Sequence, residues 1–324
     1  MGHPLDAYRA APVVVLGAGG FIGRWVARAL TRCGADLSLG VRDLAAFAQV
    51  AADWRIEGSV HAVDLSEPDA ARALCAELRP AVVFNLAGYG VDREEREEEA
   101  ADRLNRRLPE ALAGALAEHA SGDWPGRSLV HAGSALEYGP LEGPVCESLP
   151  SRPDTLYGRS KWAGARAIAE ASRASGLRAV EGRIFTAYGP GERPGRLLPS
   201  LLAARDGDGP IALSDGRQPR DFVYVEDVAE ALLRLGLCRE PGFEVVHVAT
   251  GVLHPVRRFV EVAAEVLALD AARLQFGARG HLREEMWHGP VSVSRLRERL
   301  DWTPARMPRE GVAATLRAAT EGLR

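Results

Sequence analysis

The sequence predicts an α/β protein with a doubly wound parallel sheet, followed by a smaller α/β lobe. From residue 12 to about residue 182, short β-branched or aliphatic runs alternate with amphipathic helical stretches, as repeated βαβ units do. Beyond Tyr188 this rhythm breaks at the segments GPGERPG and RDGDGP, whose glycines and prolines indicate loops. We therefore expect residues 1–185 to form the doubly wound domain and residues 186–324 to form most of the lobe.

Apolar runs bounded by turn residues are the expected strands of this sheet. They cover residues 13–16, 36–41, 59–63, 81–87, 128–132 and 177–184. Residues 222–235 and 243–249 alternate helical and extended patterns, and we expect the chain to return to the sheet through them. Pro109 interrupts a helical pattern and should bend or restart that helix, because proline has no amide hydrogen to donate.

The bulk composition excludes several classes of protein. A chain of 324 residues, 47% of them hydrophobic, can bury an ample core. Its formal net charge of −4 gives no reason to expect nucleic acid or an anionic membrane as a partner. The sequence has no apolar run of about 18 residues, so we expect a cytoplasmic protein without a membrane span. The 4 cysteines lie far apart without metal-ligand spacing, which predicts free thiols and no metal site.

A glycine-rich turn follows the first predicted strand. VVVLGAGGFIGRWVARAL places Gly17, Gly20 and Gly23 between a β-run and a helical pattern. Glycines there permit a tight turn and a close approach of the backbone to a pyrophosphate, while the helix N-terminus supplies amide donors. In this context the trio predicts a Rossmann dinucleotide-binding domain.

The second predicted strand ends where such a domain meets the adenosine ribose. Arg42 at this point would accommodate the 2′-phosphate of NADP, whereas an acid would bind the 2′-hydroxyl of NAD. Arg42 is the first residue after the strand and favours NADP(H) over NAD(H). If the residue that contacts the ribose is instead the next one, Asp43, the preference is reversed. Asp64, with Leu65 after it, follows the third predicted strand and could meet the adenine edge or cap a turn.

Tyr157 and Lys161 stand four positions apart in LYGRSKW, at the start of a helical pattern. Positions i and i+4 share one face of a helix, so these side chains should project side by side. Taken alone, such a pair is more often a feature of a helix surface than of a catalytic site. The other motifs of the chain favour the catalytic interpretation.

Several motifs stand in the order and spacing of one known family. They are GAGGFIG (17–23), NLAG (85–88), GSALEYG (133–139), YGRSK (157–161), RIFTAYGPGERP (183–194), RQPRDFVYVEDVAEAL (217–232) and LRERLDWTP (296–304). In these motifs the chain resembles the extended short-chain dehydrogenase/reductase family, whose members mostly act on nucleotide sugars. The resemblance extends almost to the C-terminus.

The resemblance implies a catalytic set. Tyr157 would be the acid/base, Lys161 its partner and a ligand of the cofactor ribose, and Ser134 the hydroxyl that polarises the substrate. Asn105 matches an asparagine that helps a proton path in many members, although a role on the helix surface is equally compatible with the sequence. We expect a nearby ammonium and the positive nicotinamide of the oxidised cofactor to favour the tyrosine phenolate and to lower its pKa from about 10 towards the working pH. The cofactor-binding residues implied by the motifs and by the strand ends are Gly17, Gly20, Phe21, Ile22, Gly23, Arg42, Asp64, Leu65, Leu86, Ala87, Gly88 and Lys161.

Positions at which the chain departs from the family pattern reduce the number of reactions that we expect. Ala135 and Leu136 occupy the positions of the two acids that family dehydratases carry after the catalytic hydroxyl residue, so dehydration is not expected. Arg220 resembles the arginine that grips the substrate diphosphate. Thr186 stands where many members have an asparagine, and the segment MWHG (286–289) departs from the usual lead-in to the last motif. The candidate substrate residues are Ser134, Thr186, Arg193, Arg220 and Arg283, and His288 is a further possible pocket residue.

These observations predict an NADP(H)-dependent reductase that acts on a nucleotide-linked keto-deoxysugar, most plausibly at C4. The alternative is an NAD-dependent nucleotide-sugar 4-epimerase, which would use the same residues in both directions. A non-catalytic dinucleotide sensor on the same fold is a third hypothesis, and the presence of Ser134, Tyr157 and Lys161 argues against it. By analogy with the family we expect a homodimer formed through helices near residues 96–120 and 157–175.

Overall fold

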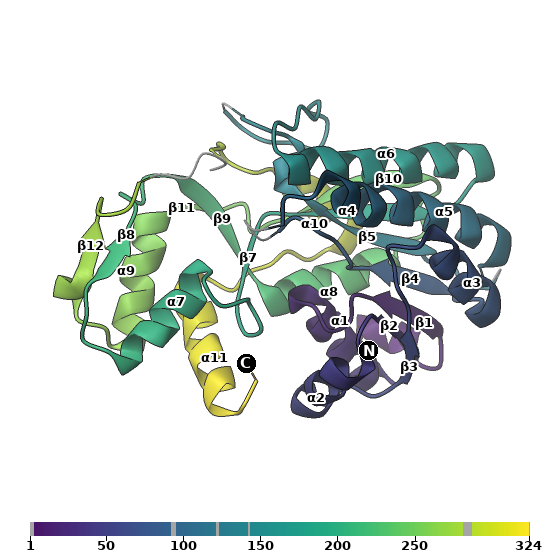
Figure 1. Cartoon of the computed structure of the whole chain (residues 1–324). Helices are drawn as coiled ribbons and strands as arrows, with labels where there is room; N and C mark the ends of the chain where they lie inside the picture. The colour runs from purple at the N-terminus through teal and green to yellow at the C-terminus, as the bar shows by residue number, and fades with distance from the viewer. Residues whose placement is uncertain (1–2, 92–94, 121–122, 142, 281–286, 324) are drawn as a thin grey trace.

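The computed structural model describes residues 3–91, 95–120, 123–141, 143–280 and 287–323. Its centre is a 7-stranded sheet with the order β10-β6-β5-β4-β1-β2-β3 (Figure 1). Every pairing within this sheet is parallel. The strands are β1 (Pro12–Leu16), β2 (Asp36–Val41), β3 (Ser59–Ala62), β4 (Val82–Asn85), β5 (Leu129–Ser134), β6 (Ala179–Ile184) and β10 (Phe243–Val248).

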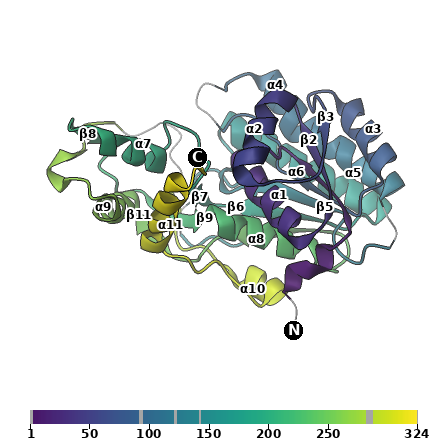
Figure 2. The same ribbon diagram turned by 90° about the horizontal axis from the view of Figure 1, so that it is seen from below.

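Helices cover both faces of this sheet (Figures 1 and 2). One face carries α1 (Phe21–Cys33), α2 (Leu44–Trp54) and α8 (Val225–Gly236). The other face carries α3 (Pro68–Leu78), α4 (Glu98–Asp102), α5 (Leu108–His119) and α6 (Leu156–Ser175). The two layers of helices make the sheet doubly wound, as the alternating pattern predicted.

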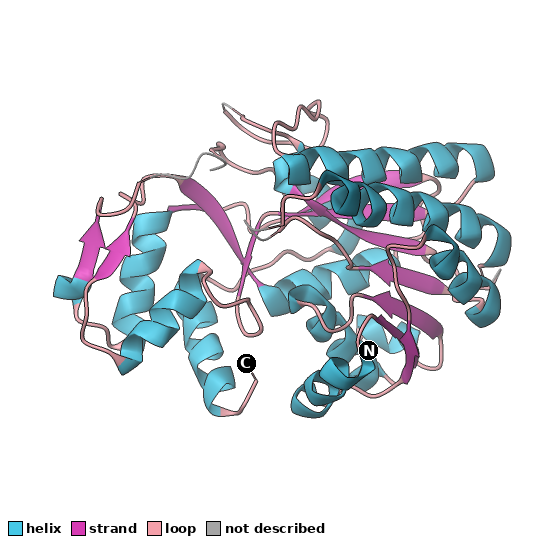
Figure 3. Ribbon diagram, in the orientation of Figure 1, coloured by secondary structure: helices cyan, strands magenta, loops and turns pink. Residues whose placement is uncertain are grey.

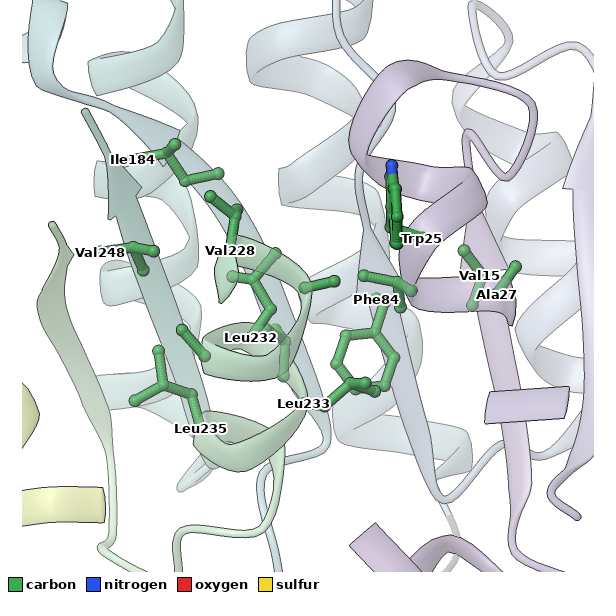
Figure 4. Packing of buried hydrophobic residues seen from close by; sticks show 14 of the residues in the cluster. Val15, Trp25, Ala27, Phe84, Ile184, Val228, Leu232, Leu233, Leu235 and Val248 are labelled. Atoms are coloured by element: carbon green, nitrogen blue, oxygen red, sulfur yellow. The ribbon is translucent and has the colours of Figure 1, made fainter. Parts of the chain in front are cut away.

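The packing of α8 shows how the later part of the chain joins the first domain (Figure 4). Leu232 and Leu233 of α8 lie in one buried cluster with Phe84 of β4, Val248 of β10 and Ala27 of α1. Both leucines are 0% exposed. Burying a side chain of this size contributes about 1.5–3 kcal/mol, so α8 is a structural part of the sheet layer rather than of the lobe.

The lobe is built from two small sheets and three helices (Figure 3). In the first sheet β9 (Pro219–Tyr224) lies between β7 (Thr186–Tyr188), which is parallel to it, and β11 (Leu253–Pro255), which is antiparallel. In the second sheet β8 (Ile211–Leu213) pairs with β12 (Leu274–Phe276). The helices are α7 (Leu197–Ala203), α9 (Val256–Leu267) and α11 (Pro308–Thr320), while α10 (Ser294–Leu300) lies against β10.

Short helical turns join these elements. They are the 3₁₀ turns Pro4–Tyr8, Ala135–Glu137, Ala204–Asp206 and Ala271–Arg273, and the π turn Arg103–Arg107. The π turn separates α4 from α5, which begins with Pro109 in its first turn. The backbone stays right-handed helical at Arg103, Arg107 and Leu108, so Pro109 does not restart the helix but follows a π turn within one continuous helical segment.

The predicted fold class is confirmed, and the predicted strands differ from the observed ones mainly at their ends. Residues 86–87 lie beyond β4, and residues 177–178 precede β6. The boundary of the domains at residue 185 stays a prediction, and the structure adds that α8 and β10 belong to the layers of the large sheet. Within the described ranges, each helix is too short or too polar to cross a lipid bilayer.

Candidate active site at the carboxyl edge of the sheet

The predicted cofactor and catalytic residues meet at one edge of the sheet. Parallel strands place their carboxyl ends side by side, and this is where α/β proteins of this kind bind ligands. The glycine turn follows β1, and residues 86–88 follow β4. Ser134 is the last residue of β5. Residues far apart in the sequence thus line the same edge.

The glycine turn has the shape of a dinucleotide cradle. Gly17 has φ +77°, and a Cβ atom there would lie 2.8 Å from the backbone nitrogen of Ala87. A Cβ atom on Gly23 would lie 2.0 Å from the carbonyl oxygen of Gly17. Gly20 is the N-cap of α1 and Phe21 and Ile22 begin its first turn, so backbone amides line this N-terminus. The two contacts show a tight turn packed closely against α1 and the residues after β4, and together with the amides of the helix N-terminus this turn fits NAD(P).

An arginine and an acid follow β2, and a second acid follows β3. Arg42 is exposed, while Asp43 is the N-cap of α2 and accepts a hydrogen bond from Ala46 N at 3.0 Å. Asp64 accepts hydrogen bonds from the Ser66 amide at 2.9 Å and hydroxyl at 2.7 Å. These bonds lower the pKa of Asp64, and Arg42 contributes to the same effect. Asp43 and Asp64 thus both accept hydrogen bonds from their own turns, and Arg42 is the exposed cation at the end of β2. Leu65, the next residue along, is half-buried and packs against the core on the α3 side of the sheet.

Ser134 and Tyr157 lie together at the centre of this edge. Thr155 caps α6 by accepting a hydrogen bond from Gly158 N at 3.0 Å, so the helix begins one residue before Tyr157. The Ser134 hydroxyl lies close enough to Tyr157 to lower the pKa of its phenol. The Ser134 hydroxyl also accepts from Leu136 N at 3.2 Å, which fixes its direction. Two hydroxyls so placed can bind one carbonyl oxygen between them.

The pKa of Tyr157 moves against the sequence-based expectation. We expected a neighbouring ammonium to lower it, but the structure raises it above its ordinary value. Burial is the main cause, because it disfavours the phenolate, and the carboxylate of Glu137 adds to the effect. Arg196 and the nearby Ser134 hydroxyl act in the opposite direction. Tyr157 is therefore held as a protonated phenol, the form that donates a proton.

Lys161 lies one turn further along α6, buried against the sheet. Its Nζ is 3.2 Å from His131 Nε2, and His131 Nδ1 is 3.1 Å from Asn85 Nδ2. Burial lowers the pKa of His131 well below its ordinary value, so the ring is neutral. An ammonium at Lys161 donates to Nε2, which places the ring hydrogen on Nδ1. The amide oxygen of Asn85 has no hydrogen-bond partner among the described residues, and turning the amide by about 180° offers this oxygen to Nδ1.

Lys161 is also the only lysine in the 324-residue sequence, against 39 arginines. Arginine therefore serves every other cationic position of this chain. An ammonium is compact, can be shifted in pKa and fits a narrow buried site, whereas a guanidinium is planar and always charged. The single lysine supports a chemical role for Lys161. This signal is present in the sequence but did not enter the prediction of the site.

Asn105 lies in the π turn between α4 and α5, and its side chain holds a neighbouring loop. Its Oδ1 accepts from Tyr89 N at 3.0 Å, and its Nδ2 donates to Tyr89 O at 2.7 Å and to Ser160 Oγ at 2.9 Å. The side chain thus fixes the loop after β4, next to Gly88. The structure links Asn105 to α6 through Ser160, and a part in proton transfer stays a prediction.

Two of the predicted substrate residues lie on strands of the lobe, and a third lies in the loop that leads to α7. Thr186 begins β7, and Arg220 lies on β9 close enough to His288 to lower the pKa of that histidine, after burial as the main cause. Arg193 forms an ion pair with Glu95 at 3.5 Å. Glu95 itself accepts from Gly90 N at 2.7 Å. Arg283 lies outside the described residues.

Three side chains near Tyr157 were not predicted from the sequence. Glu137 follows Ser134 by three residues and accepts from the Ser134 amide at 2.8 Å. Glu95 and Arg196 act on the Tyr157 pKa from the loop after β4 and from the start of α7. Glu137 was visible as an acid at the third position after a serine, the pattern of a capping box. The other two are brought in by the tertiary fold and had no local signal.

The chain is similar to a known protein family, to individual proteins of related sequence and to solved structures. The model of the NAD dependent epimerase/dehydratase family matches residues 13–246. The chain is 32% identical to dTDP-6-deoxy-L-talose 4-dehydrogenase (NAD(P)(+)) of Kitasatospora kifunensis, over 93% of each chain. It is 30% identical to the probable dTDP-4,6-dihydroxy-2-methyloxan-3-one 4-ketoreductase of Streptomyces antibioticus, over 79% of this chain and 76% of that protein. A solved structure of MoeE5 in complex with UDP-glucuronic acid and NAD is 26% identical, with a TM-score of 0.80 over 96% of this chain and 99% of that one.

Proposed function

The chain belongs to the NAD dependent epimerase/dehydratase family and is an NAD(P)-dependent oxidoreductase, and from this premise we propose that it reduces the C4 keto group of a nucleotide-linked deoxysugar with NADPH. The observation that carries the proposal is the position of Ser134 at the end of β5 next to Tyr157, which stands one turn before buried Lys161 on α6. In this arrangement Ser134 holds the carbonyl oxygen and Tyr157 gives it a proton. The nicotinamide supplies hydride transfer when it is bound.

Two features support reduction over dehydration. Ala135 and Leu136 bring no carboxylate to the positions after Ser134. Glu137, the next acid, is 0% exposed, and its carboxylate accepts hydrogen bonds from Ser134 N and Arg183 Nη2. An elimination needs an acid and a base that reach the sugar, and Glu137 is turned into the protein instead.

The relatives support the reacting position and the kind of sugar. The two related proteins named above are a 4-dehydrogenase and a probable 4-ketoreductase of dTDP sugars. The first of them covers nearly the whole of this chain, including the lobe. Arg220 and Arg193 are the cationic side chains we propose for the diphosphate, because a guanidinium forms paired hydrogen bonds with phosphate oxygens.

A turnover experiment tests the reaction. The purified protein is incubated with dTDP-6-deoxy-L-talose and either NADP⁺ or NAD⁺, and formation of reduced nicotinamide is followed by absorbance. We expect one reduced nicotinamide for each sugar oxidised. The alternative function, 4-epimerisation, is favoured by the description of the matched family. Conversion of UDP-glucose to UDP-galactose without net change of the nicotinamide would favour the epimerase and contradict the proposal.

We propose NADPH as the preferred cofactor because Asp43 caps α2, whereas Arg42 is exposed at the ribose end. Fluorescence titration with NADPH and NADH should show a preference for NADPH of about tenfold or more, equal to about 1.4 kcal/mol. The preference should disappear in Arg42→Ala and persist in Arg72→Ala, a control at a half-exposed arginine of α3. A preference for NADH in the wild type would assign the ribose to Asp43.

We also propose that two copies associate through α5 and α6, which pack side by side on one face of the sheet. Light scattering after size-exclusion chromatography tests this proposal. A mass near twice 34.8 kDa is expected, and a mass near 34.8 kDa would refute it.

A further inference from the structure

Behind Ser134 and Tyr157 the structure buries a cluster of four charged side chains. Glu137 and Glu181 are 0% exposed, and Lys161 and Arg183 are each 3% exposed. Burying one of these ions without a counter-charge is strongly unfavourable. The cluster contains two acids and two cations, so its charges cancel when all four are ionised. We call this set the charge cluster.

Arg183 is the centre of the charge cluster. Its Nε donates to Glu181 Oε1 at 2.7 Å, and its Nη2 donates to Glu137 Oε2 at 2.9 Å. The guanidinium also lies over the ring of Tyr138, 4.4 Å from the centroid. Glu137 uses its second oxygen, Oε1, to accept from Ser134 N at 2.8 Å. A chain of short contacts therefore runs from Glu181 to the backbone of Ser134.

Lys161 joins the charge cluster through His131, its neighbour at 3.2 Å, because His131 of β5 is paired in register with Glu181 of β6 on the same face of the sheet. Its hydrogen-bond partner is the neutral imidazole of His131. Burial lowers the pKa of Lys161, whereas the charges of Glu137 and Glu181 raise it. Burial also raises the pKa of Glu137, with a further increase from Glu181, and Arg183 and Lys161 oppose that rise. When they are ionised, Glu137 and Glu181 are thus the counter-charges of the buried ammonium.

The sheet makes room for this cluster. Gly133 of β5 pairs in register with Arg183 of β6, and a Cβ atom on Gly133 would lie 2.4 Å from Glu181 Oε1. Towards the amino ends of the same two strands this face carries Leu129 and Ala179, which lie in an apolar cluster. The face therefore changes from apolar to charged at its catalytic end, and the glycine leaves the space that the carboxylate occupies.

We propose that Glu181 and Glu137, bridged by Arg183, are positioning residues that keep Lys161 charged in its buried place and hold the backbone of Ser134. The effect of these residues on turnover rests on the proposed function, whereas their effect on the charge of Lys161 is independent of it. The groups that face Lys161 or its partner Tyr157 are His131 from β5, Glu137 from the following turn, Glu181 and Arg183 from β6, Glu95 from the loop after β4 and Arg196 from the start of α7.

The single lysine of the sequence makes the proposal directly measurable. Protein labelled with [ε-¹³C]lysine gives one lysine side-chain signal in an NMR spectrum, and its pH titration reports the charge of Lys161 without substrate or cofactor. Glu181→Gln is the sharpest variant, because the bond from Arg183 Nε to Oε1 is kept and Oε2 has no hydrogen-bond partner in the described structure. We expect about a tenfold increase in the acid dissociation constant of Lys161.

Two further variants separate charge from structure. Glu170→Gln is the matched control, since Glu170 is an exposed acid on the same helix and pairs with Arg166. It should leave the Lys161 titration unchanged. Glu181→Asp keeps the charge but shortens the side chain, so it should restore most of the wild-type titration if charge is what matters. Should Glu181→Gln fail to fold, the same comparison is made with Glu137→Gln, which also removes one negative charge.

An unchanged Lys161 titration in Glu181→Gln would overturn the proposal, as would an equal shift in Glu170→Gln or a failure of Glu181→Asp to restore the titration. Kinetics with dTDP-6-deoxy-L-talose provide the second readout. A lower kcat at nearly constant KM in Glu181→Gln, with a displaced pH profile, is expected for a positioning residue. If the wild type does not oxidise this sugar, the proposed function fails while the NMR titration still decides the role of the charge cluster.

Discussion

Replacing Asp221 by asparagine should weaken the attachment of the lobe, because the Asp221 carboxylate holds the connection between β10 and β11. Asp221 is 0% exposed. Its Oδ1 accepts from Thr250 N and Thr250 Oγ1, each at 2.8 Å, and its Oδ2 accepts from Gly251 N at 2.7 Å. An asparagine keeps one oxygen, and its amide group would face buried N–H donors that it cannot satisfy.

The size of the effect follows from these contacts. A buried donor left without an acceptor costs about 1–3 kcal/mol, and at least one of the described amides loses its acceptor along with the carboxylate charge. We therefore expect Asp221→Asn to lower the free energy of unfolding by about 2–4 kcal/mol. Because Asp221 precedes Phe222 and follows Arg220 on β9, the change should also raise the KM for the nucleotide sugar.

Urea denaturation and hydrogen exchange of residues 250–252 measure both parts of this prediction. Asp270→Asn is the control, because exposed Asp270 caps a 3₁₀ turn by accepting from Ala272 N, which asparagine does equally well. The control should change the free energy of unfolding by less than about 0.5 kcal/mol. The reasoning would be refuted if Asp221→Asn stayed within that range and the exchange of residues 250–252 were unaltered.

Three more predictions follow from the site. Gly23→Ala should weaken NADPH binding at least about tenfold, since its Cβ would lie 2.0 Å from Gly17 O, and unchanged affinity in a fluorescence titration would count against the cradle. His131 has a lowered pKa in the folded protein, so its neutral form stabilises the fold above about pH 6.5 and this stability is lost as the pH falls. Thermal unfolding at falling pH should therefore show a smaller loss in His131→Gln than in the wild type, and equal losses would contradict this. Because the pKa of Tyr157 is raised, the rate of keto-sugar reduction should stay level between about pH 6 and pH 8 while the rate of sugar oxidation rises, and stopped-flow measurement of both directions would expose the opposite trend.

Much of the large domain was predictable because its signals are local. The strand at residues 36–41 has the predicted bounds, since alternating aliphatic residues and flanking turns define it without help from the rest of the chain. Gly17 and Gly23 were recognisable for the same reason, as a glycine turn between a strand and a helix. Tyr157 and Lys161 lie on one helix, so their spacing alone placed them on one face.

The charge cluster was not predictable in this way. Glu137 and Arg183 are separated by 46 positions, and only the parallel pairing of β5 with β6 brings them together. The direction of the Tyr157 pKa depends on burial, which is a property of the assembled site rather than of neighbours in the sequence. The lobe mixes short strands with loops, and its small sheets join segments as distant as β8 and β12.

Oxidation of dTDP-6-deoxy-L-talose by the Tyr157→Phe variant tests the central claim most directly. The control is Tyr89→Phe, which removes the hydroxyl of a nearby tyrosine whose contact is with Glu97 N at 3.4 Å. We predict that Tyr157→Phe lowers kcat by about 10²–10⁴-fold while NADPH affinity is retained and the control stays active. A Tyr157→Phe enzyme that oxidises the sugar at the wild-type rate would contradict the account.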